Sequence, residues 1–190
     1  MSISSSTSAG PASAPISKSR CLLRKARGAP IEVRERLLKF LREHQVLTLA
    51  VMEADGSPYA AALFYAVDDE LRFQVVTDPA TRHGKAMLAN PSVAGTIQLD
   101  RQHWHEIRGV QFRGICRQLG GTERARAWEI YGARFPFLQQ PNAILTRELA
   151  NTAMWRIDTT WMRLIDNQIG FGHKEEWTPP AAPGVALPSV

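Results

Sequence analysis

The sequence has few cysteines and lacks any long apolar run. Its 190 residues include only two cysteines, Cys21 and Cys116, so neither a disulfide framework nor a paired-cysteine zinc site is expected. No stretch reaches the roughly 18 apolar residues that a membrane-spanning helix requires. The sequence therefore predicts a cytoplasmic protein with free thiols, and it places Cys116 in an apolar stretch as a small buried residue.

Motifs of several common enzyme classes are also missing. The sequence contains no Gly-Lys-Ser/Thr phosphate loop, no dinucleotide-binding glycine fingerprint and no serine elbow. His103 and His105 lie two residues apart, so both imidazoles would share one face of an extended segment. They have no identifiable acidic or cysteine partner, and two histidines do not complete a metal site. We therefore predict no metal site.

The net positive charge is confined to the start of the chain. Of the 23 Lys and Arg and the 18 Asp and Glu residues, five basic residues and no acidic one lie in residues 1–30, which leaves 18 of each sign. The rest of the chain is thus neutral overall. A neutral domain gives no reason to expect nucleic-acid binding.

Three segments differ in composition. Residues 1–30 are rich in Ser, Ala, Pro and Arg without hydrophobic periodicity, and we expect a disordered basic leader there. Its composition resembles a transit peptide, but we prefer a species-specific extension. Residues 31–177 are expected to form one domain, and residues 178–190, which contain four prolines, a Pro-rich tail.

Short strands and helices alternate along the domain. Asp55-Gly56 between two β-rich runs is a strong hairpin signal, and Asn90-Pro91 ends a helix because the residue before proline avoids helical backbone angles. Helices are expected at residues 30–44, 81–89, 122–135 and around Ile144. Strands are expected at residues 46–53, 58–67, 71–77, 93–99, 107–119, 154–158 and 161–165. This pattern indicates an α+β domain built on an antiparallel sheet or barrel.

The segment from Thr77 to Lys85 carries most of the polar chemistry. Here a strand ends, a loop follows, and a helix begins near Thr81. Free backbone N–H groups at a helix start, with hydroxyls and cationic side chains beside them, bind anions. Arg82 would hold a phosphate through two parallel hydrogen bonds, and Lys85 would add a point charge. The alternative is that Thr81 only caps the helix while Arg82 and Lys85 face solvent.

This segment resembles the strand–loop–helix–strand passage of the pyridoxamine 5'-phosphate oxidase-like group. The shared pattern comprises Thr77, Thr81-Arg82-His83 and Asn90-Pro91-x-Val93. Two further runs, residues 107–114 and 166–177, make the chain similar to the YhbP-type bacterial proteins of the same group. The resemblance covers about residues 32–177 and implies the six-stranded antiparallel split β-barrel that binds FMN, with flanking helices. It also implies a homodimer with the flavin at the subunit interface.

The resemblance implies a flavin site where this strand, loop and helix meet, at residues 77–85, and we call this place the corner. In that group the passage binds the FMN phosphate, and the preceding strand lies along the isoalloxazine ring. The strand Ala60–Tyr65 would pass beside the ring, although its alanines equally fit a tightly packed strand pair. The candidate cofactor residues are Ala61, Ala62, Val76, Thr77, Thr81, Arg82, His83 and Lys85.

Two departures from the group's pattern bear on function. His83 stands where the oxidases have a phosphate-binding lysine, and a neutral imidazole offers one donor and no charge. FMN affinity is therefore expected to fall as the pH rises through the imidazole range. The substrate-binding run of the oxidases, of the Arg-Leu-His-Asp-Arg type, is absent, so we do not expect a true pyridoxamine 5'-phosphate oxidase.

The end of the domain carries a glycine-rich segment with two aromatic residues. Its glycines permit positive φ, so Phe171 and Trp177 are candidates to cover a flavin face, and Lys174 to contact an anionic substrate. The alternative is a packed turn in which Trp177 anchors the tail.

Three functions remain open. The first is an FMN-dependent oxidoreductase acting on a small molecule, in which the flavin carries the redox chemistry and no catalytic side chain is assigned. The second is a non-catalytic binder of FMN, haem or deazaflavin, because related split barrels accommodate such cofactors; His105 and His173 are candidate haem ligands. The third, a nucleic-acid module, is disfavoured by the neutral charge of the domain.

Overall fold

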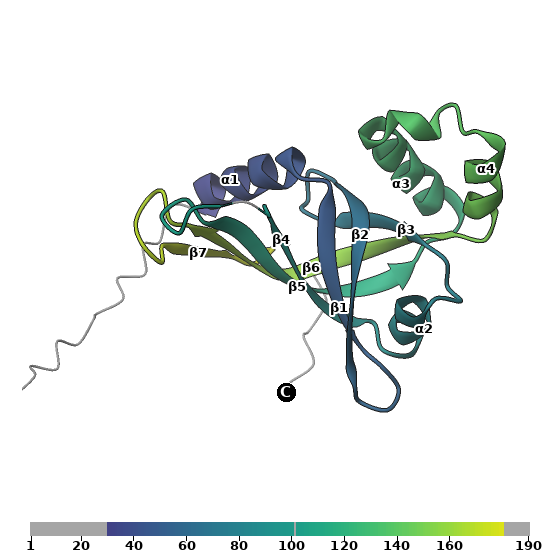
Figure 1. Ribbon diagram of the computed structural model, residues 1–190, viewed down its shortest axis with the longest axis horizontal. Helices are drawn as coiled ribbons and strands as arrows, with labels where there is room; N and C mark the ends of the chain where they lie inside the picture. The colour runs from purple at the N-terminus through teal and green to yellow at the C-terminus, as the bar shows by residue number, and fades with distance from the viewer. Residues whose placement is uncertain (1–29, 101, 181–190) are drawn as a thin grey trace, which may run out of the picture.

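The computed structural model describes residues 30–100 and 102–180 as an antiparallel barrel flanked by helices (Figure 1). The helices in this part of the chain are α1 (Pro30–Glu43), α2 (Arg82–Ala89), α3 (Gly121–Arg134) and α4 (Ala143–Ala150), with a 3-10 turn η1 (Pro136–Leu138). Its strands are β1 (Val46–Met52), β2 (Pro58–Val67), β3 (Phe73–Thr77), β4 (Ser92–Gln98), β5 (Arg108–Gln118), β6 (Ala153–Asp166) and β7 (Lys174–Trp177). The expected leader and most of the expected tail lie outside the described residues.

Six strands close the barrel in the order β3-β2-β1-β4-β5-β6, and β3 pairs with β6 to complete the ring. All of these pairings are antiparallel. Val75 of β3 lies opposite Tyr65 of β2 on one side and opposite Trp155 of β6 on the other. The expected fold, an α+β domain with a six-stranded antiparallel split barrel, is therefore confirmed.

Alternating apolar side chains fill the barrel. On β1, Leu47, Leu49 and Val51 point inward and are at most 4% exposed, because side chains alternate between the two faces of a strand. Across the interior, the rings of Phe73 and Phe112 lie 4.7 Å apart between centroids. The inside of the barrel is thus the main hydrophobic core, and its apolar side chains pack against one another.

Helix α1 covers one end of the barrel (Figure 1). Leu37, Phe40 and Leu41 are fully buried, because their spacing places them on one helical face. The hydroxyl of Tyr65 on β2 donates a hydrogen bond of 2.7 Å to the backbone oxygen of Leu41. Burial raises the pKa of the Tyr65 phenol, so this side chain remains a neutral donor that ties α1 to the barrel wall.

One long strand, β6, replaces the two strands expected at residues 154–158 and 161–165. Its register against β5 shifts between Arg113 and Gly114, which lie opposite Trp161 and Thr159 respectively. A bulge of this kind bends a strand without ending it. The expectation of two strands was therefore wrong, and the single strand pairs with β3 at its start and with β7 at its end.

Strand β7 was not expected from the sequence. Lys174 lies opposite Ile165, and Trp177 opposite Met162, so β7 adds an outer strand to the second half of β6. The Arg36 Nη1 of α1 lies 2.6 and 2.5 Å from the two carboxylate oxygens of Glu175 on β7. This charge-assisted pair anchors the strand to the helix.

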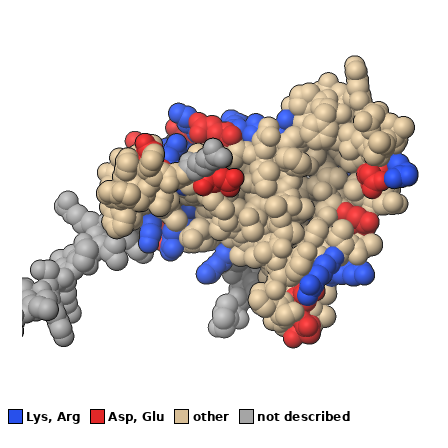
Figure 2. Space-filling view, in the orientation of Figure 1, with Lys and Arg blue, Asp and Glu red and all other residues tan. Residues whose placement is uncertain are grey.

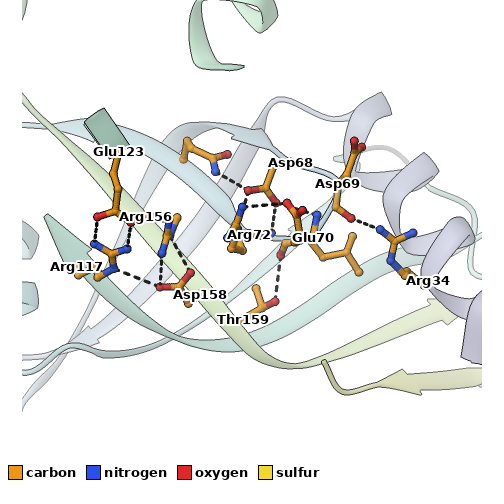
Figure 3. A network of polar contacts seen from close by, with 12 residues as sticks. Arg34, Asp68, Asp69, Glu70, Arg72, Arg117, Glu123, Arg156, Asp158 and Thr159 are labelled. Carbon is orange, nitrogen blue, oxygen red and sulfur yellow. Dashed lines mark hydrogen bonds and ion pairs between the residues drawn. The ribbon is translucent and has the colours of Figure 1, made fainter. Parts of the chain in front are cut away.

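A polar network fixes the turn between β2 and β3 (Figure 3). The Asp68 carboxylate accepts hydrogen bonds of 2.9 and 2.7 Å from the backbone N–H and the Nε of Arg72. Between them, Leu71 adopts a positive φ of 61°, and its carbonyl accepts a 3.0 Å bond from the Thr159 hydroxyl. The strand expected to begin at residue 71 therefore begins at Phe73.

Helices α3 and α4 form a smaller cluster at the other end of the molecule (Figure 1). Helix α3 packs against β2, β3 and β6, with Ala127 and Tyr131 as its buried residues.

In residues 30–100 and 102–180, no helix combines the length and the apolar character needed to cross a membrane.

Candidate cofactor site

Thr81 caps the N-terminus of α2. Its backbone is extended, with φ −65° and ψ 163°, and its hydroxyl oxygen accepts a 3.1 Å hydrogen bond from the backbone N–H of Gly84. The same hydroxyl donates to the backbone oxygen of Asp78 at 2.6 Å. The helix start therefore uses the side chain of Thr81 for its own N-cap.

A glycine allows α2 to begin close to the preceding loop. A Cβ atom at Gly84 would lie 2.5 Å from the backbone oxygen of Asp78 and 2.8 Å from the Cα of Pro79. These are backbone atoms that cannot yield without moving the loop. This requirement was not predicted from the sequence, although a glycine within the first turn of an expected helix is a signal of close packing.

Two backbone donors remain free at this helix start. Within the described part of the chain, the N–H groups of Arg82 and His83 have no acceptor, whereas Lys85 N–H bonds to the carbonyl of Thr81 at 2.9 Å. Unsatisfied N–H groups in the first turn carry the positive end of the helix dipole. They are suited to bind an anion.

Arg82 is ion-paired rather than facing solvent alone. Its Nε and Nη2 donate to the two carboxylate oxygens of Glu53 at 2.7 and 2.5 Å, and its guanidinium carbon lies 4.8 Å from the ring centroid of Tyr59. These hydrogen bonds lower the pKa of the Glu53 carboxyl below its usual value. Both partners come from the β1–β2 hairpin, whose tip lies beside α2 (Figure 1).

His83 is turned toward the barrel wall. Its Nε2 lies 2.6 Å from the hydroxyl oxygen of Thr77, and its ring stacks with that of Tyr59 at a centroid distance of 6.4 Å. Burial lowers the pKa of the imidazole from its usual value of 6.5. The backbone oxygen of Thr77 in turn accepts a 3.2 Å bond from the Trp155 indole. His83 is therefore a neutral, oriented ring near pH 7.

The remaining candidates on β2, β3 and α2 lie near this corner with different exposures. Val76 is half-buried on β3, next to the buried Thr77, and Lys85 is exposed on α2. Ala62 is exposed on the outer face of β2, whereas Ala61 points inward opposite Leu49. Only the outward alanine is available to a ligand on the outside of the barrel.

Lys174 and Trp177 lie far from the corner within one subunit. Trp177 pairs with Met162, whereas Val76 pairs with Met154 at the other end of β6. Eight residues of strand separate these two positions, which corresponds to roughly 26 Å. Trp177 is 8% exposed and packs in the main core, and Lys174 is exposed. A single chain does not bring β7 to the N-terminus of α2.

The glycine-rich segment forms a loop with an exposed aromatic tip. Phe171 is 82% exposed and meets Trp104 edge to face, with centroids 5.9 Å apart. Asn167 joins the two loops, since its Nδ2 donates to the Trp104 carbonyl at 2.7 Å and its Oδ1 accepts from Gly172 N–H at 3.0 Å. Gly172 has a φ of 73°, which fits its role in this turn. His173 is half-buried, 3.2 Å from Glu175.

A second group of arginines links α3 to the barrel (Figure 3). Arg117 and Arg156 pair with both Glu123 of α3 and Asp158 of β6 at 2.5 to 3.5 Å. Hydrogen bonding to Arg117 lowers the pKa of Glu123 to about 2. Both guanidinium groups are compensated by carboxylates, so this cluster is a structural link rather than an anion site.

Cys116 is an inert core residue. It is 1% exposed, and its Sγ lies 3.3 Å from the Sδ of Met87. Burial raises the pKa of the thiol to about 12, so the nucleophilic thiolate does not form near neutral pH. The expectation of a small buried residue is confirmed.

The family model described as Pyridoxamine 5'-phosphate oxidase matches residues 33–166. The chain belongs to the pyridoxamine 5'-phosphate oxidase family. Two relatives are UPF0306 proteins. One, from Photorhabdus laumondii, is 34% identical over 140 residues, covering 73% of this chain and 91% of the relative. The other, from Yersinia pseudotuberculosis, is 30% identical over 141 residues, covering 74% and 89%. The expected kinship with the YhbP-type members of the pyridoxamine 5'-phosphate oxidase-like group is confirmed.

Solved structures of similar fold include two that are described as haem proteins. A heme binding protein from Mycobacterium smegmatis matches with a TM-score of 0.62 and 17% identity, over 80% of this chain and 59% of that protein. HutZ, the heme storage protein from Vibrio cholerae, matches with a TM-score of 0.55 and 17% identity, over 66% of this chain and 89% of that protein. At these identities the likeness of the two haem proteins to this member of the pyridoxamine 5'-phosphate oxidase family is one of fold.

Proposed function

We propose that the chain binds FMN through its phosphate at the N-terminus of α2 and acts as a flavin-dependent oxidoreductase on a small molecule. The observation that carries the proposal is the pair of free N–H groups at Arg82 and His83, on a helix start of a family whose fold is shared with the oxidases. The outward edge of the Arg82 guanidinium adds donors, because its Nη1 has no partner among the described residues. The donor set therefore fits a phosphate.

Each residue of the corner has a distinct role in this proposal. Thr77 orients His83 by engaging its Nε2, which leaves Nδ1 as the ring nitrogen available to a ligand. Arg82 supplies directed donors, and Lys85 supplies an exposed charge. When bound, FMN would supply the electron-transfer chemistry, while the protein would hold the phosphate and orient the ring along β2 and β3.

We propose further that the working unit is a homodimer. The outward positions of β1, β2 and β4 carry no charged side chain: Val46, Thr48, Ala50 and Met52, then Pro58, Ala60, Ala62 and Phe64, then Ser92, Ala94, Thr96 and Gln98. A broad exposed sheet face without charges is unusual on a monomer, and it fits self-association.

The distance between β7 and the corner supports the same proposal. Lys174, on β7, and Phe171, in the loop before it, are exposed but lie beside the far half of β6 in their own subunit. They would contact a flavin only if a second copy placed them there. A two-subunit site, with both ends of the barrel contributing, is consistent with these positions and with the dimer proposed above.

The visible spectrum of freshly purified protein tests cofactor binding. We expect flavin absorption bands at about 370 and 450 nm, which are the positions of the cofactor itself. If the protein is purified without flavin, titration with FMN should quench the FMN fluorescence. Arg82→Ala should lose most of the retained FMN, whereas Arg126→Ala, at an exposed position of α3, should retain it. A colourless protein that accepts no FMN, or equal retention by Arg82→Ala, would contradict the proposal.

Reduction of the bound flavin separates an enzyme from a carrier. We expect NADH or NADPH to bleach the band near 450 nm under anaerobic conditions, and air to restore it. A flavin that remains oxidised with both nicotinamides would favour the non-catalytic binder instead. Membership of the family does not specify the acceptor, so quinones and other small planar molecules are the first compounds to assay.

Haem is the second candidate cofactor, and the two similar structures described as haem proteins favour it over deazaflavin. His103 and His105 offer exposed rings whose centroids lie 5.7 Å apart, close to Trp104. A Soret band after addition of haemin, lost in His105→Ala but kept in His44→Ala, would support haem binding at this loop. FMN and haem bands are spectrally distinct, so one titration series decides between them.

A further inference from the structure

Glu53 lies where the chain leaves β1, and Arg82 is the first residue of α2, 29 residues later. The two side chains form a two-point ion pair, and they differ in exposure: the Glu53 side chain is 18% exposed and that of Arg82 is 61% exposed. The carboxylate is thus set into the protein surface, while the guanidinium reaches over it from the helix.

The hairpin tip fixes the position of Glu53. Its backbone N–H donates to the carbonyl of Ser57 at 2.9 Å, and its carbonyl accepts from Gly56 N–H at 3.0 Å. The Ser57 hydroxyl lies 3.3 Å from Oε2 of Glu53 and 2.6 Å from Oδ1 of Asp55. The turn therefore fixes the backbone of Glu53, and the exposed Arg82 side chain reaches the carboxylate from the helix.

The charged side chains at the corner, two basic and three acidic, together carry no net positive charge. Glu53 neutralises Arg82, Asp55 and Asp78 lie on the two adjoining turns, and Lys85 is the remaining cation of the α2 N-terminus. Figure 2 shows acidic and basic side chains side by side at the lower right, where the β1–β2 hairpin tip and α2 lie in Figure 1. His83, whose ring is neutral near pH 7, adds no charge.

We propose that Glu53 is a specificity-determining residue that weakens the hold of the α2 N-terminus on phosphate, so that only a ligand with further contacts is retained. This inference rests on the proposed phosphate site. In it, Glu53 occupies the Nε–Nη2 edge of Arg82 and repels a phosphate dianion bound at the remaining edge. Inorganic phosphate and other small anions are thereby excluded, while FMN compensates through contacts of its ring.

The same contact has an opposite interpretation, in which Glu53 helps by holding Arg82 in place. The two interpretations differ in sign. An orienting residue makes binding tighter, and its removal loses affinity. A like-charged neighbour makes binding of a dianion weaker, and its neutralisation gains affinity. Repulsion should dominate here, because the Glu53 carboxylate directly contacts the guanidinium that would contact the phosphate. A phosphate dianion is repelled by this carboxylate twice as strongly as a monoanion at the same distance.

Glu53→Gln tests the inference, because glutamine keeps the size and one acceptor oxygen while removing the charge. Titrations with FMN, riboflavin and inorganic phosphate give three binding curves for each variant. We expect Glu53→Gln to bind FMN about tenfold more tightly than the unmodified chain, and to gain measurable binding of inorganic phosphate. Riboflavin, which lacks the phosphate, should bind both proteins equally. Asp55→Asn, which neutralises a hairpin acid without a hydrogen bond to Arg82, should change FMN affinity by less than about twofold.

The outcomes separate this inference from the proposed function. Should the unmodified chain bind FMN through Arg82 while Glu53→Gln binds it no more tightly, only the role of Glu53 is overturned. Should the unmodified chain bind no FMN while Glu53→Gln binds it, Glu53 is supported and FMN as the cofactor of the natural chain is overturned. Should neither bind FMN, both are overturned. Circular dichroism and thermal unfolding of each variant show that the comparison concerns folded protein.

Discussion

The Nε2 atom of His83 lies 2.6 Å from the hydroxyl oxygen of Thr77, the last residue of β3. This contact joins the first turn of α2 to the barrel wall and fixes which ring nitrogen faces outward. The family oxidases, by the resemblance described above, carry lysine at this position. The contact with Thr77 gives histidine a structural role that a lysine ammonium would not reproduce in the same geometry.

His83→Lys should raise FMN affinity and flatten its pH dependence. In the unmodified chain, the imidazole contribution to FMN affinity should be lost mainly below about pH 7 as the pH rises, because burial lowers the pKa of His83 and its ring is already neutral near pH 7. Lysine stays charged across this range. The phosphate group itself titrates near pH 6, so the comparison between the two proteins, rather than either curve alone, isolates the imidazole. Parallel curves for the two proteins would remove His83 from the binding equilibrium.

His83 should also make the stability of the protein depend on pH. Burial lowers its pKa in the folded state, so the unfolded chain binds the proton more readily. The contribution to stability is complete above the ordinary pKa of about 6.5 and is lost as the pH falls toward the folded value. His83→Gln should therefore reduce the drop in Tm between about pH 7.5 and about pH 5.5. Thermal unfolding that shows the same drop in both proteins would contradict this assignment.

Gly84→Ala should destabilise the protein by about 1–3 kcal/mol, because the new methyl group would overlap the backbone of Asp78 and Pro79. Gly132→Ala on α3 is the matched control, since nothing lies within 4 Å of a Cβ there. That change should stabilise the helix by about 0.5–1 kcal/mol. Urea unfolding of both variants measures the sign of each change in the free energy of unfolding. Equal changes in the two variants would show that the loop before α2 moves to make room for the methyl group.

Thr48→Glu should shift the protein from dimer to monomer. Thr48 lies on the uncharged outer face of the barrel, opposite Ala62 and Thr96, and a twofold contact through this face would bury the new carboxylate of each subunit without a counter-charge on β1, β2 or β4. Thr122→Glu, at an exposed position of α3, should leave the dimer intact. Light scattering after size exclusion measures both. An unmodified chain that is monomeric and still binds FMN tightly would overturn the two-subunit site.

Local patterns in the sequence were enough for most of the fold. The β-rich run at residues 46–53, the Asp55-Gly56 hairpin and the helix start at Thr81 all depend on neighbouring residues, and the structure has a strand, a hairpin and a helix start at these places. The continuity of β6 was not predictable in the same way, because the bulge opposite Arg113 is a feature of pairing rather than of composition. Strand β7 likewise depends on an anchor in α1, far away in the sequence.

The candidate site shows the same division. The backbone donors at Arg82 and His83 follow from a helix start that the sequence predicts. The partner of Arg82 does not, because Glu53 precedes it by 29 residues and no spacing rule connects a hairpin tip to a distant helix. The pKa of His83 also depends on tertiary packing, since its neighbours Thr77 and Tyr59 come from two different strands.

The pairing of β3 on both edges has a consequence for how a ligand leaves. Val76 and Thr77 pair with β6, and the preceding residues of β3 pair with β2 as well. Strand β3 therefore cannot move away from the corner without breaking its hydrogen bonds to the neighbouring strands. The hairpin tip beyond Met52 has no such second neighbour in the sheet. Residence time at the corner should then follow the fluctuations of this tip, and off-rates should change with tip mutations that leave the rate of global unfolding untouched.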